Sequence, residues 1–165
     1  MNDTTTPAAL REQAASLRLH GLLEHWAEVM AEPEQARWVA QMLAWETTER
    51  SRRSLERRLR EAHIGRFKPL ADFDWAWPKQ IDRGAVEELM TLDFVKDASN
   101  VVLVGPNGVG KSMCACNIDY QAVLAGHTAL FTTAGQLLGE LAALDSDSGL
   151  RRKLRQYAEI GRAHV

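Results

Sequence analysis

The chain has 165 residues, which is room for one modest α/β core and a helical extension. It is 45% hydrophobic and 25% charged, the composition of an ordinary soluble globular protein. The formal net charge of −2 hides an uneven distribution, because basic residues crowd the stretch from Arg50 to Lys68, so local charge says more about partners than the total does.

The chain lacks the signals of export and of membrane insertion. Its first residues have no basic start and no apolar core, which excludes a signal peptide, and no apolar run is long enough to span a membrane. Cys114 and Cys116 are the only cysteines, and two positions apart on a helix they point in different directions and cannot pair. Because free thiols fit a reducing compartment, we expect a cytoplasmic protein without membrane contact.

Helical periodicity begins after a lead-in, residues 1–7, that is expected to be disordered. Apolar residues then recur at three- and four-residue steps, and Pro33 separates two helical segments. The second segment has Trp38 and Trp45 on the side that is expected to pack. Residues 8–63 are thus predicted to form a helical N-terminal region, a possible DNA- or partner-binding region, whose aromatic stripe serves packing.

The second half of this second helix is rich in arginine. Arg53, Arg57 and Arg60 share one face at the spacing i, i+4, i+7, and such a basic helix can neutralise DNA phosphates without reading sequence. The same arginines alternate with glutamates, which is also typical of a solvated helix with weak ion pairs. The residues alone leave both interpretations open. The candidate nucleic-acid contacts are Arg52, Arg53, Arg57, Arg58 and Arg60.

Residues 64–81 are predicted to be a linker, because they contain two prolines and a cluster of aromatic residues. The aromatic residues are Phe67, Phe73, Trp75 and Trp77. Aromatic rings can stack on nucleic-acid bases, but no basic residues alternate with these four. We therefore expect the rings to be buried against a core.

Residues 105–112 read GPNGVGKS, which fits the pattern G-x-x-x-x-G-K-[ST] of a phosphate-binding loop. The apolar, β-branched run 101–104 before it is typical of a buried parallel strand, and residues 112–125 after it have helical spacing and end before Gly126. Strand, loop and helix are the context that the motif requires. The alternative is a glycine-rich turn that binds nothing.

The residue types of this loop explain how it can hold a nucleotide. Glycines allow positive φ, so that backbone N–H groups converge on the β-phosphate at the positive end of the following helix. Lys111 is expected to bring charge to the β- and γ-phosphates, and the Ser112 hydroxyl to bind Mg²⁺. The candidate residues for ATP and Mg²⁺ are Gly105, Pro106, Asn107, Gly108, Val109, Gly110, Lys111 and Ser112.

Downstream of the loop, residues 128–133 are predicted to form a second parallel strand. A helix is expected from Gln136 to Leu144 and a basic helix from Leu150. Hydrolysis needs an acidic residue at the end of a buried strand, and the one match to that pattern, Asp145, falls at a helix end. Catalytic residues are therefore not assigned, and we expect ATP binding without efficient hydrolysis.

The predicted fold class is α/β, with the helical region followed by a partial phosphate-loop domain, residues 82–158, that has a parallel sheet and flanking helices. Asp82 or a neighbouring residue is expected to cap its first helix. Two strands are fewer than a stable α/β domain needs, so we expect a chain truncated on its C-terminal side. Residues 159–165, EIGRAHV, are predicted to be a non-native tail, because a sequencing adapter encodes this sequence in one frame.

The combined motifs resemble the IstB-like ATP-binding proteins. These are helper ATPases of bacterial insertion-sequence transposition, related to DnaC-type helicase loaders in the AAA+ superfamily. The resemblance covers about residues 8–158, but only the first part of a typical member. It rests on FKPLADF (67–73), LDF (92–94), NVVLVGP (100–106) with the loop, AGHTALFTTA (125–134) and RRKLR (151–155).

The resemblance implies a helical N-terminal region followed by an AAA+ domain that binds ATP and Mg²⁺. It also implies homo-oligomers that assemble on double-stranded DNA with weak sequence preference and assist the transposase of the same element, which favours DNA contact by the arginines. Two other interpretations stay open. One is a DnaC-like replicative helicase loader, and the other is a non-functional fragment that folds poorly alone.

Overall fold

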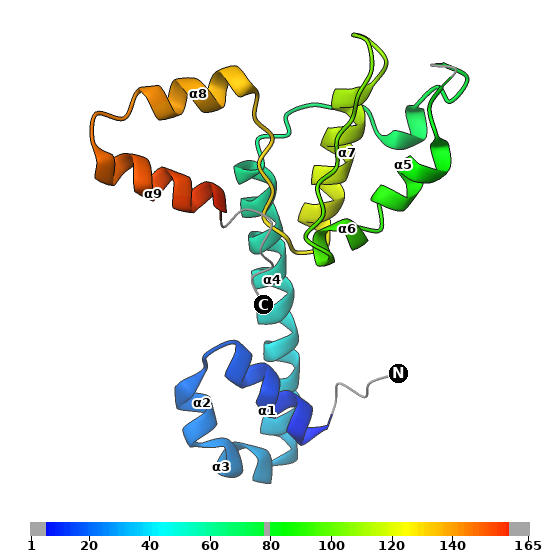
Figure 1. Cartoon of the computed structure of the whole chain (residues 1–165). Coiled ribbons are helices and arrows are strands. Elements are labelled where there is room, and N and C mark those ends of the chain that lie inside the picture. Colours follow the sequence, from blue (N-terminus) through cyan, green and yellow to red (C-terminus); the bar gives the residue numbers. More distant parts are fainter. Residues whose placement is uncertain (1–5, 78–79, 159–165) are drawn as a thin grey trace. The chain divides into compact units, whose positions relative to one another are not determined.

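The computed structural model of the chain describes residues 6–77 and 80–158 and divides into two compact units, Met1–Ser54 and Leu55–Val165. The unit boundary falls inside the long helix α4. Residues 1–5 of the predicted lead-in and the predicted tail, 159–165, lie outside the described residues. The helices are α1 (Pro7–Ser16), α2 (His20–Glu24), α3 (Trp26–Ala31), α4 (Pro33–Glu61), the 3₁₀ helix η1 (Leu70–Asp72), α5 (Arg83–Leu89), α6 (Asp93–Lys96), α7 (Lys111–Leu124), α8 (Ala134–Ala142) and α9 (Asp147–Ala158) (Figure 1).

The first unit packs α1 against the first half of α4. Helix α1 begins at Pro7, and the Oγ1 atom of Thr6 accepts a hydrogen bond from the N–H of Ala9 at 3.3 Å, which caps the helix. The side-chain amide of Gln13 donates to Thr47 Oγ1 at 2.7 Å and so links the two helices. The buried residues of this unit form one cluster: Leu10, Ala14, Leu17, Val39 and Leu43.

The prediction that Trp38 and Trp45 form the packed face of α4 was wrong. Their exposed fractions are 59% and 60%, whereas Val39 and Leu43 are buried. One residue corresponds to about 100° of rotation around a helix, so the face that contains Val39 turns Trp38 away from the core of this unit. The spacing of apolar residues predicted the helix, but it did not show which face is covered.

The second unit is organised around α7, which is buried on several sides. Cys116 and Val123 pack with Ala62 and Ile64, which follow α4. Cys114 lies in a cluster with residues of the linker and α5, and Ile118 in a third cluster with residues around α6. Figure 1 shows α5 and α6 beside α7, in agreement with these clusters.

Side chains cap two helices of this unit. As predicted, Asp82 caps α5, because its Oδ1 atom accepts a hydrogen bond from the N–H of Ala85 at 3.0 Å. Thr133 and Gln136 form a capping box at the start of α8. None of the helices in the described part of the chain is long and apolar enough to cross a membrane.

The predicted α/β fold class, with its parallel sheet, was wrong. The described residues form no sheet, and the two segments expected to be strands, 101–104 and 128–133, lack strand pairing. Val102 and Val104 are 78% and 89% exposed, and Phe131 donates its N–H to the carbonyl of Ala62 at 2.8 Å rather than to a strand. An apolar β-branched run becomes a strand only when a neighbouring strand accepts and donates its backbone hydrogen bonds, and the described residues supply no such neighbour.

Candidate nucleotide-binding loop

The loop predicted to bind phosphate, residues 105–112, connects the segment 101–104, in which Val102 and Val104 are exposed, to the start of α7. Its turn contains Gly108 at φ +82° and Gly110 at φ +94°, and Gly110 is the N-cap residue of α7. Backbone with such positive φ is in the left-handed region, where a side chain is unfavourable. These two glycines therefore give the loop the backbone that the motif requires.

The start of α7 presents backbone donors beside this turn. The first backbone hydrogen bond of the helix runs from the N–H of Cys114 to the carbonyl of Gly110 at 2.9 Å. The N–H groups of Lys111, Ser112 and Met113 have no acceptor among the described residues. Free N–H groups at the positive end of a helix dipole are the groups that bind phosphate oxygens.

Lys111 lies over the loop. Its Nζ atom donates to the carbonyl of Gly105 at 2.8 Å and to that of Pro106 at 2.6 Å. The Ser112 side chain is exposed at the first turn of α7. Backbone donors, a lysine ammonium and a serine hydroxyl thus lie together in one short segment, and this donor set fits the phosphates of a nucleotide with Mg²⁺.

A cleft of about 670 Å³ adjoins the loop. Its walls are the segment 101–106, one side of α5 and residues Lys111 and Cys114 of α7. This volume is within the range of small-molecule sites, which are concave and mainly apolar. Trp77, which is 62% exposed and the most exposed aromatic residue of the linker, also lines the cleft. The cleft therefore offers space next to the donors that are predicted to bind phosphate.

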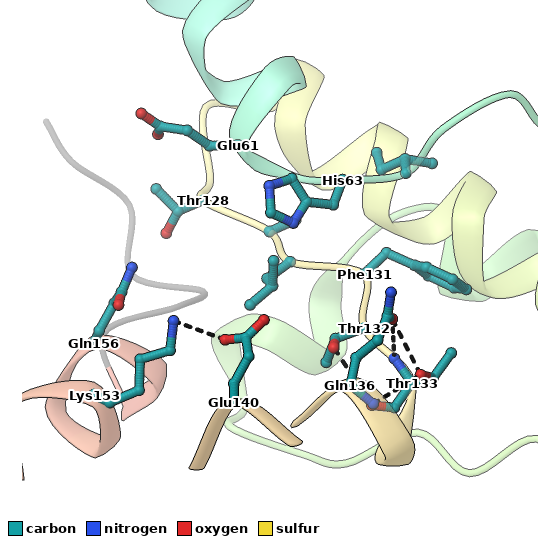
Figure 2. A pocket seen from close by; sticks show the side chains of 13 residues that line it. Glu61, His63, Thr128, Phe131, Thr132, Thr133, Gln136, Glu140, Lys153 and Gln156 are labelled. Atoms are coloured by element: carbon teal, nitrogen blue, oxygen red, sulfur yellow. Dashed lines mark hydrogen bonds and ion pairs between the residues drawn. The ribbon is translucent and has the colours of Figure 1, made fainter. Parts of the chain in front are cut away.

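A second cavity, of about 640 Å³, lies between the end of α4, the segment 128–133, α8 and α9 (Figure 2). Two of its charged groups, Glu140 and Lys153, bind each other. Lys153 Nζ lies 2.8 Å from Glu140 Oε2, and the Tyr157 hydroxyl donates to the same oxygen at 2.7 Å. The hydrogen bond from Lys153 is the main reason why the pKa of Glu140 is lowered. We interpret this cluster as a structural link between α8 and α9.

The five candidate arginines have different surroundings. Arg52 and Arg53 both bind Glu49, with nitrogen–oxygen distances of 2.8 and 2.7 Å. The hydrogen bond from Arg52, followed by that from Arg53, lowers the pKa of Glu49 to about 2. Arg58 Nε donates to the carbonyl of Val123 at 3.3 Å, at the last turn of α7. Arg57 and Arg60 are exposed and make no hydrogen bond or ion pair with the described residues.

The acidic residue that matched the hydrolysis pattern, Asp145, lies in the connection between α8 and α9, close to the helix end where it was expected. No group of three or more His, Cys, Asp or Glu side chains that could hold a metal ion occurs within residues 6–77 and 80–158. The described residues thus bring together the backbone donors, the lysine ammonium and the serine hydroxyl of the phosphate motif.

Comparison with known proteins decides the family. Residues 12–162 match the family described as "IstB-like ATP binding protein". The chain belongs to this family. The resemblance inferred from its motifs is thereby confirmed.

Three curated relatives define the match further. The chain is 35% identical over 153 residues to an insertion sequence IS21 putative ATP-binding protein of Pseudomonas aeruginosa, covering 92% of this chain and 57% of the relative. It is 33% identical over 161 residues to an IS21-like putative ATP-binding protein of Bacteroides fragilis (94% and 60% covered). It is 27% identical over 156 residues to the IS5376 putative ATP-binding protein of Geobacillus stearothermophilus (91% and 62%). The chain thus spans 57–62% of these relatives' length.

Asn117 is the one buried polar residue in the described part of this IstB-like chain, and no sequence motif indicated it. The Asn117 Oδ1 atom accepts from the N–H of Leu70 at 2.9 Å, and its Nδ2 atom donates to the carbonyls of Lys68 and Met113 at 3.0 and 2.8 Å. One side chain thus ties the linker to α7. An asparagine between the apolar residues Cys116 and Ile118 was the available signal.

Asp119 is a second residue of α7 that the sequence did not single out. Burial raises the pKa of its carboxyl group from 3.8 to about 6. Because the folded pKa lies above the unfolded one, the ionised carboxylate destabilises the fold above about pH 6, and this cost disappears as the pH falls toward 4. We expect Asp119→Asn to raise the free energy of unfolding at pH 7.5 by about 1–2 kcal/mol, allowing for partial exposure, and not at pH 4.

Urea unfolding at the two pH values measures this difference. Asp145→Asn is the matched control, because Asp145 is exposed in the connection between α8 and α9 and should change stability at neither pH. If Asp119→Asn raised the free energy of unfolding equally at pH 4 and pH 7.5, the charge of Asp119 would not be the cause of the stabilisation.

Proposed function

We propose that this IstB-like chain binds the triphosphate of ATP at residues 105–112 and serves in the transposition of an insertion sequence. The observation that carries the proposal is the arrangement at the start of α7, where two glycines with positive φ, three free N–H groups and the Lys111 ammonium meet. The family match and the names of the relatives support both the nucleotide and the biological setting.

Each group of the loop has a role in this proposal. The N–H groups of Lys111, Ser112 and Met113 bind oxygens of the β-phosphate. Lys111 leaves the carbonyls of Gly105 and Pro106 and turns its ammonium to the β- and γ-phosphates, which are stronger acceptors because they are charged. The Ser112 hydroxyl holds Mg²⁺, which when bound neutralises phosphate charge. We propose binding without efficient hydrolysis for the chain as it stands.

The partners proposed are those that the family resemblance implies. They are double-stranded DNA bound with weak sequence preference, the transposase of the same element and further copies of the protein. The observation that favours DNA contact is the exposure of Arg57 and Arg60, which are three residues apart on α4 and have no partner among the described residues. By contrast, Arg52, Arg53 and Arg58 are engaged within the protein.

Removal of these two free charges is expected to weaken DNA binding. The double substitution Arg57→Gln and Arg60→Gln should reduce the slope of log affinity against log salt by about 2, since each phosphate contact contributes about 0.9 for duplex DNA. Fluorescence anisotropy with a labelled duplex between 50 and 200 mM salt measures the slope. Arg52→Gln with Arg53→Gln is the control and should change it less, because Glu49 already binds both arginines.

Thermal unfolding tests the nucleotide proposal. A ligand that binds only the folded chain stabilises it by about 2.7 kcal/mol at a hundred times its Kd, so saturating Mg-ATP should raise the melting temperature by several degrees. Calorimetry of the purified 165-residue chain with and without Mg-ATP measures the shift. Cooperative unfolding without any shift would contradict the proposal, and unfolding without cooperativity would support the interpretation as a poorly folded fragment.

A further inference from the structure

The linker places an aromatic ring directly against the phosphate-binding loop. A Cβ atom on Gly110 would lie 2.6 Å from Cε2 of Phe73 and 3.3 Å from its Cζ. The ring is 8% exposed. Two features therefore disfavour a side chain at position 110: the positive φ of the residue, and the ring that occupies the space beside it.

Further contacts hold this ring in place. The centroid of Trp75 lies 4.7 Å from that of Phe73, at an interplanar angle of 51°, and the Arg83 guanidinium lies 5.2 Å from the centroid of Trp75. Tilted ring pairs and a cation over an indole are both favourable arrangements. The same apolar cluster includes Leu103 before the loop and Cys114 after it. The ring thus shares a cluster with residues on both sides of the loop.

The backbone of the linker is fixed just before this ring. Phe73 donates its N–H to the carbonyl of Leu70 at 3.1 Å, which closes η1. Asn117 holds the backbone of Lys68 and Leu70, and it lies on the same helix that begins at the loop. The linker and α7 therefore form a frame in which the position of the Phe73 ring relative to Gly110 is set by residues outside the loop.

We propose that Phe73 is a positioning residue for phosphate binding, an inference that rests on the function proposed above. Gly110 is the pivot between the turn and α7, and a glycine has the greatest backbone freedom of any residue. Contact with the ring restricts this pivot, so that the N–H groups of residues 111–113 keep one direction before a ligand arrives. Such preorganisation raises affinity because less conformational freedom is lost when the ligand binds.

The test compares Phe73→Ala with Phe67→Ala in the full chain. Phe67 is half-buried in another cluster of the same unit, with its ring 5.4 Å from that of Tyr120. The probes are Mg-ATP and Mg-tripolyphosphate, titrated by calorimetry well below the melting temperature of each variant. Phe73→Ala is expected to weaken binding of both probes by the same factor, about tenfold, and Phe67→Ala to leave both within about twofold of the unchanged chain.

Conservative variants keep the test valid if Phe73→Ala folds poorly. Phe73→Leu keeps the site apolar but leaves the space at the edge of the ring unfilled, and it should lower both affinities about threefold. Phe73→Met fills irregular space and should keep both affinities close to those of the unchanged chain. Equal losses for Phe73→Ala and Phe67→Ala would overturn the inference, as would full affinity of Phe73→Ala or a loss confined to Mg-ATP.

Two controls separate this inference from the proposed function. An unchanged chain that binds neither probe, or a Lys111→Ala variant that binds both as tightly, overturns the proposed function and this inference with it. If the unchanged chain binds, Lys111→Ala loses binding and Phe73→Ala does not, the inference fails alone and the phosphate site stands.

Discussion

Lys111→Ala is expected to lower the affinity for Mg-ATP by about a hundredfold, which corresponds to about 3 kcal/mol. The physical reason is the loss of charge-assisted hydrogen bonds to the β- and γ-phosphates. Folding should be little affected, because the Nζ atom lies at an exposed loop where it binds only the carbonyls of Gly105 and Pro106 among the described groups. Calorimetric titration at constant salt measures the affinity.

Lys96→Ala is the matched control for this substitution. Lys96 is exposed at the end of α6 and forms an ion pair with Asp93 at 2.6 Å, away from the loop. Its loss removes the same charge from the unit and should leave Mg-ATP binding within about twofold, since an exposed pair contributes little. Similar losses for the two lysines would mean that net charge, and not the loop, determines the affinity.

The second large effect is expected at Asn117. Asn117→Leu keeps the volume of the side chain nearly constant but removes its bonds to the N–H of Leu70 and the carbonyls of Lys68 and Met113. The N–H of Leu70, in a partly buried place, then lacks its acceptor, and the linker loses its bonds to α7, so we expect the free energy of unfolding to fall by about 2–3 kcal/mol. Urea unfolding followed by circular dichroism measures this change.

Gln121→Leu, on the same helix, provides the comparison. Gln121 is exposed and its side chain makes no hydrogen bond with the described residues, so the change should stay within about 0.5 kcal/mol. If Asn117→Leu were as stable as Gln121→Leu, the linker would not depend on this side chain. The frame described for Phe73 would then lack its support.

Local chemistry explains which features the sequence could predict. Asp82 caps α5 because a carboxylate before a helix accepts from the first free N–H groups, and this needs no distant residue. The left-handed backbone of Gly108 and Gly110 likewise follows from the residues themselves. The glycine turn and the helix after it therefore agree with the sequence, and the resemblance to the IstB-like family is confirmed. Phosphate binding by the loop stays a prediction.

Features that depend on distant contacts were not predicted. The run 101–104 has the composition of a strand, but strand pairing needs a second segment, and in the described residues Val104 is left 89% exposed. Trp38 lies outside the core because Val39 and Leu43 face α1. The contact between Phe73 and Gly110 joins parts of the chain far apart in the sequence, and no periodicity within either segment indicates it.

Backbone amide NMR of the chain with and without Mg-ATP tests the phosphate site most directly. Phosphate oxygens that accept from the free N–H groups at the start of α7 should shift the amide signals of Gly108, Gly110, Lys111, Ser112 and Met113 most strongly. Signals around the second cavity, such as those of His63 and Thr128, should move little. Saturable ATP binding that leaves the signals of the loop unchanged and shifts those of the second cavity would contradict the account.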